Sequence, residues 1–533
     1  MTLTTSYRPA DPTPPLWEDT VGALLVRRAA EHPDRLALIG TRHGDGAAVR
    51  LTYAALLDEA RRVATALARL VGPGQPVALW APNVVEWPVI EYGAALAGVV
   101  LVALNPVLRL PELEYAIGHS RATVLLHADR SRDHDMAAVA GKLADVTAIS
   151  LADTARWRAD VADEAVIAAE PTDPSAPVML QYTSGTTGSP KGVLLRHRSL
   201  VNVAQLTMEV TAAAPGAVCV NPLPMFHTAS CVIGTLGPLC LGGTEVLVEQ
   251  FAPDPVLELL RREEASVLFY VPAVLGALLE AQRSAERPAP RLRTVMGGAA
   301  TVSPTMIQAA EDVFGASVIN LFGQTELAPV LTATRPDDSR DDQLTTVGRP
   351  LPHVEVKVVD PVDGEVVPLG EPGEICARGY QQMLCYLHDP DATAAAIDAD
   401  GWLHTGDLGA LDDRGHLRLT GRLKELIIRK GENIAPPEIE NALVAHAAVA
   451  GAAVVGLPDD EAGEIVAAVV QVRGDAGPGL RDELVAHCRE RLSPHKTPSR
   501  WFVVDAFPLT PTQKVQKFRL ADAAAGGELR ELA

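Results

Sequence analysis

A short segment rich in glycine and hydroxyl residues is the first stretch of this sequence whose residue types suggest chemistry. Residues 182–192 read YTSGTTGSPKG and follow the apolar run APVML. Glycines let successive backbone N–H groups point into one concavity, and the hydroxyls and Lys191 add groups that bind anionic oxygens. The spacing is not that of a Walker A loop, because Gly192 follows the lysine. Alone, the segment predicts either a phosphate-binding loop or a solvated turn after a strand.

Three later segments carry groups suited to a nucleotide: VMGGAA at 295–300, NLFGQTE at 320–326 and WLHTGDLG at 402–409. Glycines allow the backbone to approach a flat base closely, and Phe322 offers a face for stacking. Thr325 can donate to a phosphate, and Glu326 is a hard oxygen ligand suited to Mg²⁺. Asp407 can accept from two vicinal hydroxyls. Out of context, the TE dipeptide would be a helix cap and Asp407 a turn residue.

Taken in order, these segments resemble those of the adenylate-forming enzymes, which include acyl-CoA synthetases, adenylation domains of nonribosomal peptide synthesis and luciferases. The resemblance covers nearly the whole chain, from TVGALLVRRAAEHPDRLALIG to PTQKVQKFRL. It implies ATP and Mg²⁺ as cofactors, with Glu326 as the metal ligand. The residues that it places at ATP or AMP are Thr183, Ser184, Gly185, Thr186, Thr187, Gly188, Lys191, Gly298, Ala299, Ala300, Phe322, Gly323, Gln324, Thr325, Asp407 and Arg422.

The resemblance also assigns roles to the C-terminal segments. Lys514, in PLTPTQKVQKFRL, matches the adenylation lysine, a positive charge that would stabilise the transition state at the carboxylate and the α-phosphate. The alternative is a solvated lysine on a basic tail. Lys424 matches the hinge, and Gly431 and Glu432 match the loop on the thiol side. Two positions depart from the commonest family pattern, since Glu432 and Gln513 stand where many relatives have glycine.

The segment PLPMFHTAS at 222–230 bears on the acid. Amino-acid adenylation domains usually carry an aspartate after the aromatic residue, whereas this chain has His227, as aryl- and fatty-acyl-CoA ligases do. No acidic residue occurs between Asn221 and Gly243, so a buried ammonium would lack a partner at that wall. An α-amino acid is therefore disfavoured, while a β-amino acid stays open. The residues assigned to the acyl pocket are His227, Ala229, Ser230, Gly298 and Gly323.

His227 has two interpretations, a packed core histidine or a catalytic residue where the acyl pocket meets the thiol tunnel. The candidate catalytic residues are therefore Lys514, Glu326 and His227. The resemblance implies activation of a medium-chain, aryl or cycloaliphatic acid to acyl-AMP, followed by transfer to CoA. One alternative is an acyl-AMP ligase that loads the phosphopantetheine of an acyl carrier protein, with a β-amino or polyketide starter acid. Another is a non-catalytic nucleotide-binding relative, which the retained Lys514, Glu326 and Asp407 disfavour.

The elements that must position these residues follow from hydrophobic patterning. Short apolar runs alternate with helical patterns, as in VALWA before VVEWPVIEYGAALAG and TVLLH before DHDMAAVAGKLAD. This alternation predicts an α/β fold with buried parallel strands. The hydrophobic pattern changes near residue 421, and further along the chain Pro436 and Pro437 open a helix. We predict a large N-terminal multi-layer α/β domain at 1–421, a hinge at 422–425 and a small, mobile α+β domain at 426–533.

Composition limits the partners of the chain. Its 533 residues include 46 basic and 67 acidic side chains, a net charge of −21 that disfavours nucleic acid and anionic membrane surfaces. The six cysteines show neither a CxxC pair nor zinc spacing, which indicates thiols in a reducing compartment. The N-terminus lacks signal-peptide features, and the apolar stretch from Ala229 to Thr244 is cut by glycines and Pro238. We expect a soluble cytoplasmic protein without a membrane span.

Overall fold

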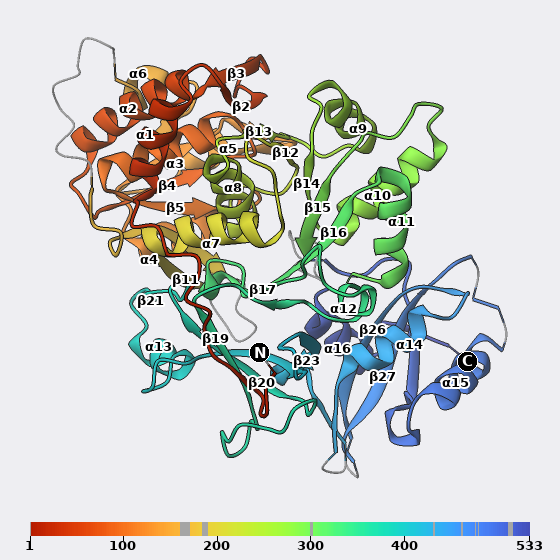
Figure 1. Ribbon diagram of the computed structural model, residues 1–533. Helices are drawn as coiled ribbons and strands as arrows, with labels where there is room; N and C mark the ends of the chain where they lie inside the picture. The colour runs from red at the N-terminus through yellow and green to blue at the C-terminus, as the bar shows by residue number, and fades with distance from the viewer. Residues whose placement is uncertain are drawn as a thin grey trace. The chain divides into compact units, whose positions relative to one another are not determined.

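A computed structural model describes residues 2–159, 171–183, 190–298, 302–429, 432–459, 462–474, 476–477, 479–509 and 515–532, with residues 432 and 433 described by their backbone (Figure 1). The chain divides into two compact units. The large unit comprises Arg8–Val356 and Ala377–Leu403, and the small unit comprises Met1–Tyr7, Lys357–Cys376 and His404–Ala533. The domain limits of 1–421 and 426–533, with a hinge at 422–425, stay a prediction.

Two sheets organise the described part of the large unit. The first has the order β21-β11-β10-β5-β4-β6-β9, and its strands from β10 to β9 are parallel. The apolar runs VALWA and TVLLH form β4 and β6, and these strands are almost entirely buried, as two-sided coverage by helices requires. The bounds are Cys385–Tyr386 for β21, Lys191–Arg196 for β11, Pro177–Thr183 for β10, Val100–Leu104 for β5, Pro76–Trp80 for β4, Val124–His127 for β6 and Thr147–Ser150 for β9.

The second sheet has the order β18-β17-β16-β15-β14-β12-β13-β2-β3, with a parallel centre from β16 to β2 and antiparallel strands at both edges. The bounds are Arg349–Pro350 for β18, Thr332–Ala333 for β17, Ser317–Phe322 for β16, Thr294–Gly298 for β15, Val267–Tyr270 for β14, Val218–Asn221 for β12, Thr244–Leu247 for β13, Leu36–Thr41 for β2 and Ala48–Thr52 for β3. A two-stranded hairpin joins β7 (Arg130–Ser131) to β8 (His134–Asp135).

Helices supply the apolar faces that bury these sheets. Leu257 of α9, Leu278 of α10 and Ile307 of α11 share one core with Leu268 and Val295 of the second sheet, and Figure 1 shows these helices beside β14–β16. The bounds are Val21–Glu31 for α1, Tyr53–Leu70 for α2, Glu86–Ala97 for α3, Leu110–Ser120 for α4, Met136–Ala140 for α5, Thr154–Trp157 for α6, His197–Val210 for α7, Gly237–Cys240 for α8, Pro253–Arg262 for α9, Pro272–Ser284 for α10, Pro304–Phe314 for α11, Arg340–Thr345 for α12 and Pro390–Ala396 for α13.

The small unit holds a sheet of order β1-β19-β20-β22-β23 and a second sheet of order β25-β24-β27-β28-β29, in which β26 also pairs with β27. The bounds are Tyr7–Arg8 for β1, Val354–Val359 for β19, Gly373–Gly379 for β20, Leu403–Leu411 for β22, Leu417–Arg422 for β23, Ile427–Arg429 for β24, Glu432–Ile434 for β25, Val449–Asp459 for β26, Gly463–Val472 for β27, Arg500–Val503 for β28 and Arg530–Glu531 for β29.

Three helices cover the second sheet of the small unit: α14 (Pro436–Val444), α15 (Leu480–Arg491) and α16 (Lys517–Ala525). Pro436 and Pro437 stand in the first turn of α14, as predicted, because that position needs no backbone N–H donor. Leu443 of α14 and Leu484 of α15 pack with Val470 in one core. Leu520 of α16 packs with Phe502 in a second core.

The α/β class predicted from the sequence is confirmed, as is the buried nature of the stretch from Ala229. That stretch forms a π-helix, η2 (Ala229–Leu236), followed by α8, and most of its residues are buried. None of the described helices combines the length and the apolar character needed to cross a membrane.

Candidate active site

The two ends of the predicted phosphate loop lie on adjacent antiparallel strands. Thr183 of β10 pairs with Lys191 of β11, and Tyr182 pairs with Gly192. The backbone register therefore closes the loop at its base and fixes where it starts and ends. Of the predicted ligands, Thr183 and Lys191 lie at this base, whereas Ser184, Gly185, Thr186, Thr187 and Gly188 lie outside the described residues.

Helix α4 holds both ends of the same loop through its tyrosine and histidine side chains. The Tyr182 hydroxyl donates to the Ala116 carbonyl at 3.0 Å and lies 3.0 Å from His119 Nδ1. The Tyr115 hydroxyl donates to the Pro190 carbonyl at 2.9 Å. Burial, and then the nearby His388, lower the pKa of His119. Sequence reasoning missed these supports, because α4 lies far from the motif in the sequence and only the fold brings the two together.

Glu326 and Lys191 meet through a residue that the sequence did not single out. Glu326 lies in η3 (Thr325–Leu327), is 9% exposed, and accepts a hydrogen bond on Oε1 from the Tyr386 hydroxyl at 2.8 Å. Lys191 Nζ lies 4.6 Å from the centroid of the Tyr386 ring. Burial, and then the charge of Glu326, raise the pKa of Tyr386, so its hydroxyl stays protonated and donates.

The chemistry of Glu326 fits a hard divalent cation. Its carboxylate offers oxygen ligands, and among the described residues only Oε1 is engaged in a hydrogen bond. A cation at this carboxylate, near the base of the phosphate loop, would offset the charge of the nucleotide's phosphates.

The glycines of the two predicted adenine loops have a structural reason that sequence reasoning did not anticipate. A Cβ on Gly297 would lie 1.9 Å from the Tyr270 carbonyl oxygen, and one on Gly298 would lie 2.0 Å from the Leu321 carbonyl oxygen. A Cβ on Gly323 would lie 2.1 Å from the Pro329 carbonyl oxygen. The close approach of these carbonyl oxygens therefore excludes a side chain at all three positions, whether or not a base approaches them. Phe322, Gln324 and Thr325 directly flank Gly323, whereas Ala299 and Ala300 lie outside the described residues.

In the small unit, Asp407 and Arg422 form an ion pair. They are cross-strand partners on β22 and β23, and Arg422 Nε lies 2.8 Å from Asp407 Oδ1. The Asp407 side chain is 8% exposed and that of Arg422 is 50% exposed. The resemblance assigned both residues to the ribose, and the register explains how two residues from separate motifs reach one place.

Glu374 and His404 support the turn that bears Asp407. The Gly406 N–H donates to Glu374 Oε1 at 3.1 Å, and His404 Nδ1 lies 2.8 Å from Glu374 Oε2. The Thr405 hydroxyl donates to the Ile375 carbonyl at 2.7 Å. His404 and Thr405 stand inside the segment WLHTGDLG, so a signal for their part existed in the sequence, whereas Glu374 had none.

The segments predicted to serve the hinge and the thiol lie in the same unit. Lys424 is exposed and belongs to a short 3₁₀ helix, η4 (Leu423–Glu425). Lys514 and Gln513 lie outside the described residues, as does Gly431, while Glu432 is described by its backbone pairing with Arg429. The flanks of residues 510–514 are joined, because Leu509 bridges Val515 and the Gln516 N–H donates to the Pro508 carbonyl at 2.8 Å.

Lys517 ties the C-terminal helix to that hinge segment. Its Nζ lies 2.8 Å from Glu425 Oε2 and 2.9 Å from Glu440 Oε1. Burial alone would lower the pKa of Lys517, but Glu440 and Glu425 outweigh it, so the pKa is raised and the lysine stays charged. The sequence analysis assigned no role to Lys517.

The segment predicted to line the acyl pocket, 222–230, leads into the π-helix η2 of the large unit. The ring of His227 lies 4.7 Å from that of Phe226, and His227 and Ala229 are partly exposed. The Ser230 side chain is buried, and its hydroxyl donates to the Leu223 carbonyl at 2.8 Å. A π-helical turn is rare and frequently marks a functional site. Of the residues assigned to the pocket, Ser230 is thus engaged within its own segment.

Comparison with known proteins identifies the family. The AMP-binding enzyme family matches residues 25–387, and the AMP-binding enzyme C-terminal domain matches residues 438–514. The chain therefore belongs to the AMP-binding enzymes, the adenylate-forming class to which its motifs pointed.

Relatives place it among the acyl-CoA ligases. It is 35% identical to the 3-[(3aS,4S,7aS)-7a-methyl-1,5-dioxo-octahydro-1H-inden-4-yl]propanoyl:CoA ligase of Rhodococcus jostii, over 94% of this chain and 98% of that protein. It is 30% identical to the mitochondrial medium-chain acyl-CoA ligase ACSF2 of Homo sapiens, over 94% of this chain and 87% of that protein.

A solved structure agrees with these relatives. The o-succinylbenzoate CoA synthetase of Bacillus subtilis, in complex with its acyl-adenylate intermediate, matches with a TM-score of 0.82 and 30% identity, over 94% of this chain and 98% of that chain. The chain is an AMP-forming acid–CoA ligase, which activates a carboxylic acid to acyl-AMP and transfers the acyl group to CoA. Enzymes of this kind use ATP, Mg²⁺ and CoA.

Proposed function

We propose that the acid is a medium-chain, aryl or cycloaliphatic carboxylic acid without an α-ammonium group. The observation that carries this proposal is the acyl segment itself. From Asn221 to Gly243 it is largely buried and bears no acidic side chain, so a substrate ammonium would have no charged partner there. Glu245, just beyond, is fully buried, and burial raises its pKa to about 8, so in its neutral form it offers an ammonium no negative charge.

The known relatives agree with this class of acid. The Rhodococcus jostii ligase is named for a ring-bearing propanoyl group, and the Homo sapiens ligase for medium-chain acyl groups. A chain with only 4% aromatic residues must line such a pocket mostly with aliphatic side chains. We infer that His227 and Ala229, which are partly exposed, face the acid, and that Gly298 and Gly323 form its floor.

For the first half-reaction, the carboxylate oxygen attacks the α-phosphorus of ATP, and the bond to the bridging oxygen breaks to release pyrophosphate. Lys514 would stabilise the charge that builds at the α-phosphate, and Lys191 would hold the phosphates that leave. Asp407 and Arg422 would hold the ribose. In the second half-reaction the CoA sulfur attacks the acyl carbon, its proton is lost to solvent, and AMP leaves.

A pyrophosphate-exchange assay with a panel of carboxylic acids tests this proposal. We expect exchange with medium-chain, benzoic-type and cycloaliphatic acids, and none above background with α-amino acids. Exchange that is fastest with an α-amino acid would contradict the proposed acid class. Lys514→Ala should abolish acid-dependent exchange, and an unchanged rate would remove Lys514 from the mechanism.

The acceptor is tested separately with CoA and with a phosphopantetheinylated carrier protein. We expect thioester formation with CoA. Transfer to the carrier protein with CoA inactive would favour the alternative of an acyl-AMP ligase for carrier loading. A cytoplasmic location remains our proposal, supported by six cysteines that form no disulfide, which suits a reducing compartment. Fractionation of cells would test it.

A further inference from the structure

Tyr386 lies where the strand of Lys191 meets the helix of Glu326, although none of the nucleotide motifs contains it. Its strand, β21, is antiparallel to β11, with Val193 opposite Tyr386. The Leu387 N–H donates to the Gly192 carbonyl at 2.7 Å, and the Met383 N–H donates to the Glu326 carbonyl at 2.9 Å. The segment 383–387 is thus bonded both to the end of the phosphate loop and to the helical turn that bears the carboxylate.

The side chain of Tyr386 repeats this double connection. Its hydroxyl donates to Glu326 Oε1 at 2.8 Å, and the ammonium of Lys191 lies 4.6 Å from the centre of its ring. The ring is 9% exposed, so water competes weakly with either contact. One side chain therefore touches both the predicted metal ligand, Glu326, and the lysine proposed to hold the leaving phosphates, Lys191.

The two contacts act differently. A hydrogen bond to Oε1 restricts rotation of the carboxylate and leaves the other oxygen to bind a cation. The face of an aromatic ring attracts an ammonium and restricts a long, flexible side chain before any ligand arrives. The hydroxyl thus orients the acid, and the ring orients the lysine.

We propose that Tyr386 is a positioning residue for the first half-reaction, whose hydroxyl orients Glu326 toward the cation and whose ring holds Lys191 beside the phosphate loop. This inference rests on the proposed roles of Glu326 and Lys191. It assigns Tyr386 no contact with the acid or with CoA.

Two substitutions separate the two contacts. Tyr386→Phe removes the hydroxyl and keeps the ring, whereas Tyr386→Leu removes both. Tyr380→Phe is a matched control, since Tyr380 is also buried and its hydroxyl has no hydrogen-bond partner in the described part of the chain. Thermal unfolding and circular dichroism show which variants fold.

The readout is calorimetric binding of α,β-methylene-ATP over a range of Mg²⁺ concentrations, which requires no turnover. We expect Tyr386→Phe to raise the Mg²⁺ concentration for half-maximal binding about 10-fold. Tyr386→Leu should weaken nucleotide binding a further ~2- to 5-fold at saturating Mg²⁺. Tyr380→Phe should match the wild type. If Tyr386→Leu does not fold, Tyr386→Phe still decides the role of the hydroxyl.

Glu326→Gln distinguishes failure of this inference from failure of the proposed function. If Glu326→Gln binds the nucleotide with the Mg²⁺ dependence of the wild type, the role of Glu326 itself is wrong. If Glu326→Gln loses that dependence while Tyr386→Phe keeps it, the hydroxyl does not position Glu326 and the inference is overturned. If Tyr386→Leu binds no more weakly than Tyr386→Phe, the part assigned to the ring is overturned. We expect Tyr386→Phe to add no further loss in the Glu326→Gln background.

Discussion

The dipeptide Thr-Glu occurs in two places in the large unit, and the two glutamates have opposite environments. Glu245 follows Thr244 on β13, and Glu326 follows Thr325 in η3. Glu245 is fully enclosed and accepts from Asn221 Nδ2 at 2.9 Å and from the Thr235 hydroxyl at 3.1 Å. Glu326 accepts from a phenol at the base of the phosphate loop. The same Thr-Glu dipeptide therefore contains a buried core acid at one position and a candidate metal ligand at the other.

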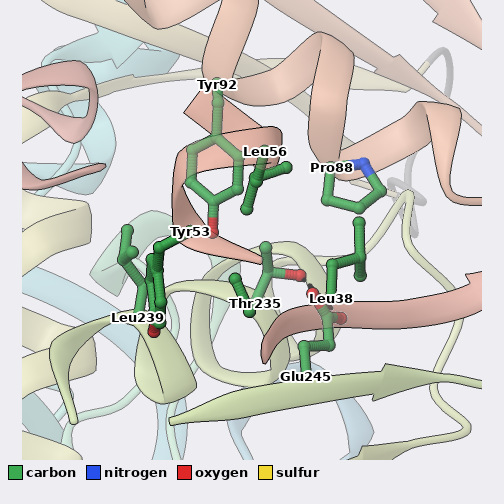
Figure 2. A pocket seen from close by; sticks show the side chains of 9 residues that line it. Leu38, Tyr53, Leu56, Pro88, Tyr92, Thr235, Leu239 and Glu245 are labelled. Carbon is green, nitrogen blue, oxygen red and sulfur yellow. Dashed lines mark hydrogen bonds between the residues drawn. The ribbon is translucent and has the colours of Figure 1, made fainter. Parts of the chain in front are cut away.

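The surroundings of Glu245 explain why it is not a binding site. It lines a cavity of about 10 Å³, which has room for at most one water molecule. Figure 2 shows Tyr53, Tyr92 and Thr235 around this space, with a hydrogen bond from Thr235 to the carboxylate. The remaining lining residues are Ala37, Leu38, Leu56, Pro88 and Leu239.

Glu91 is a second buried acid of the large unit. Both of its carboxylate oxygens are buried, with no hydrogen-bond partner among the described residues. Burial raises the pKa of Glu91 well above its usual range, and the neighbouring Glu245 carboxyl raises it further. The comparison teaches that an acidic residue can bind a cation only where its surroundings keep it accessible and charged, and four predictions test that lesson.

The largest expected effect separates the two glutamates directly. Glu326→Gln removes the charge that would hold the cation, and we expect acid-dependent pyrophosphate exchange to fall about 10²- to 10³-fold. Glu245→Gln should leave exchange per folded molecule within about 3-fold, because its carboxyl is already neutral. Steady-state exchange at saturating ATP checks both. Equal losses in the two variants would show that the environments do not distinguish the glutamates.

The second prediction concerns two acids that share one cation. Lys517 pairs with both Glu425 and Glu440, so Lys517→Met would leave two carboxylates without their positive partner. We expect the free energy of unfolding of the small unit to fall by about 3 kcal/mol. Lys517→Arg should recover much of this loss. Denaturant unfolding of the intact chain, followed by a probe in the small unit, measures it.

The control for Lys517 is Lys496 of the same unit, whose side chain is similarly exposed (23% against 21%) but pairs at 2.6 Å with one carboxylate, that of the 47% exposed Glu438. Lys496→Met should cost less than about 1 kcal/mol, since exposed ion pairs contribute little. If the two lysine variants lose the same stability, the Lys517 network is an ordinary surface pair.

Much of the fold was predictable, because hydrophobic patterning is local. The runs VALWA and TVLLH became the buried parallel strands β4 and β6, and Pro436 and Pro437 opened α14. The motifs likewise singled out Glu326, Asp407 and Arg422 by resemblance, and the roles of these residues stay predictions. Patterning therefore predicted which segments form strands and helices, and the motifs predicted single residues of the site.

The contacts between these residues were not predictable, because they depend on long-range pairing. Tyr386 bonds Glu326 across 60 positions of the chain, and Lys517 bonds Glu425 across 92. The glycines at 297 and 298 were interpreted through a nucleotide base, whereas adjacent strands already require them. Ser230 was assigned to a pocket, but the path of its own segment turns its hydroxyl to the Leu223 carbonyl.

The third prediction uses the pH dependence of stability to test whether the Glu245 carboxyl is neutral in the fold. Burial raises the pKa of Glu245 to about 8, while in the unfolded chain the carboxyl titrates near its ordinary value of 4.5. The folded protein therefore binds more protons between these two values, and its stability falls as the pH rises through that window. The slope for one proton is about 1.4 kcal/mol per pH unit.

Glu245→Gln should flatten this dependence. Thermal unfolding from pH 5 to pH 8 compares the two proteins, and the difference between them should grow in favour of the variant as the pH rises. An identical pH dependence of stability in wild type and variant would mean that Glu245 is ionised in the fold, and its environment would then not differ from that of Glu326 in this respect.

The last prediction concerns Glu91, whose carboxylate oxygens have no hydrogen-bond partner among the described residues. Glu91→Met has a similar volume and removes a buried acid that must stay neutral in the fold but ionises when the chain unfolds. From pH 5 to pH 8 the stability of the variant relative to the wild type should rise, by up to about 1.4 kcal/mol per pH unit. Denaturant unfolding at both pH values measures this. A variant less stable than the wild type at pH 8 would mean that the fold stabilises the ionised form of Glu91, and Glu91 would then resemble Glu326 rather than Glu245.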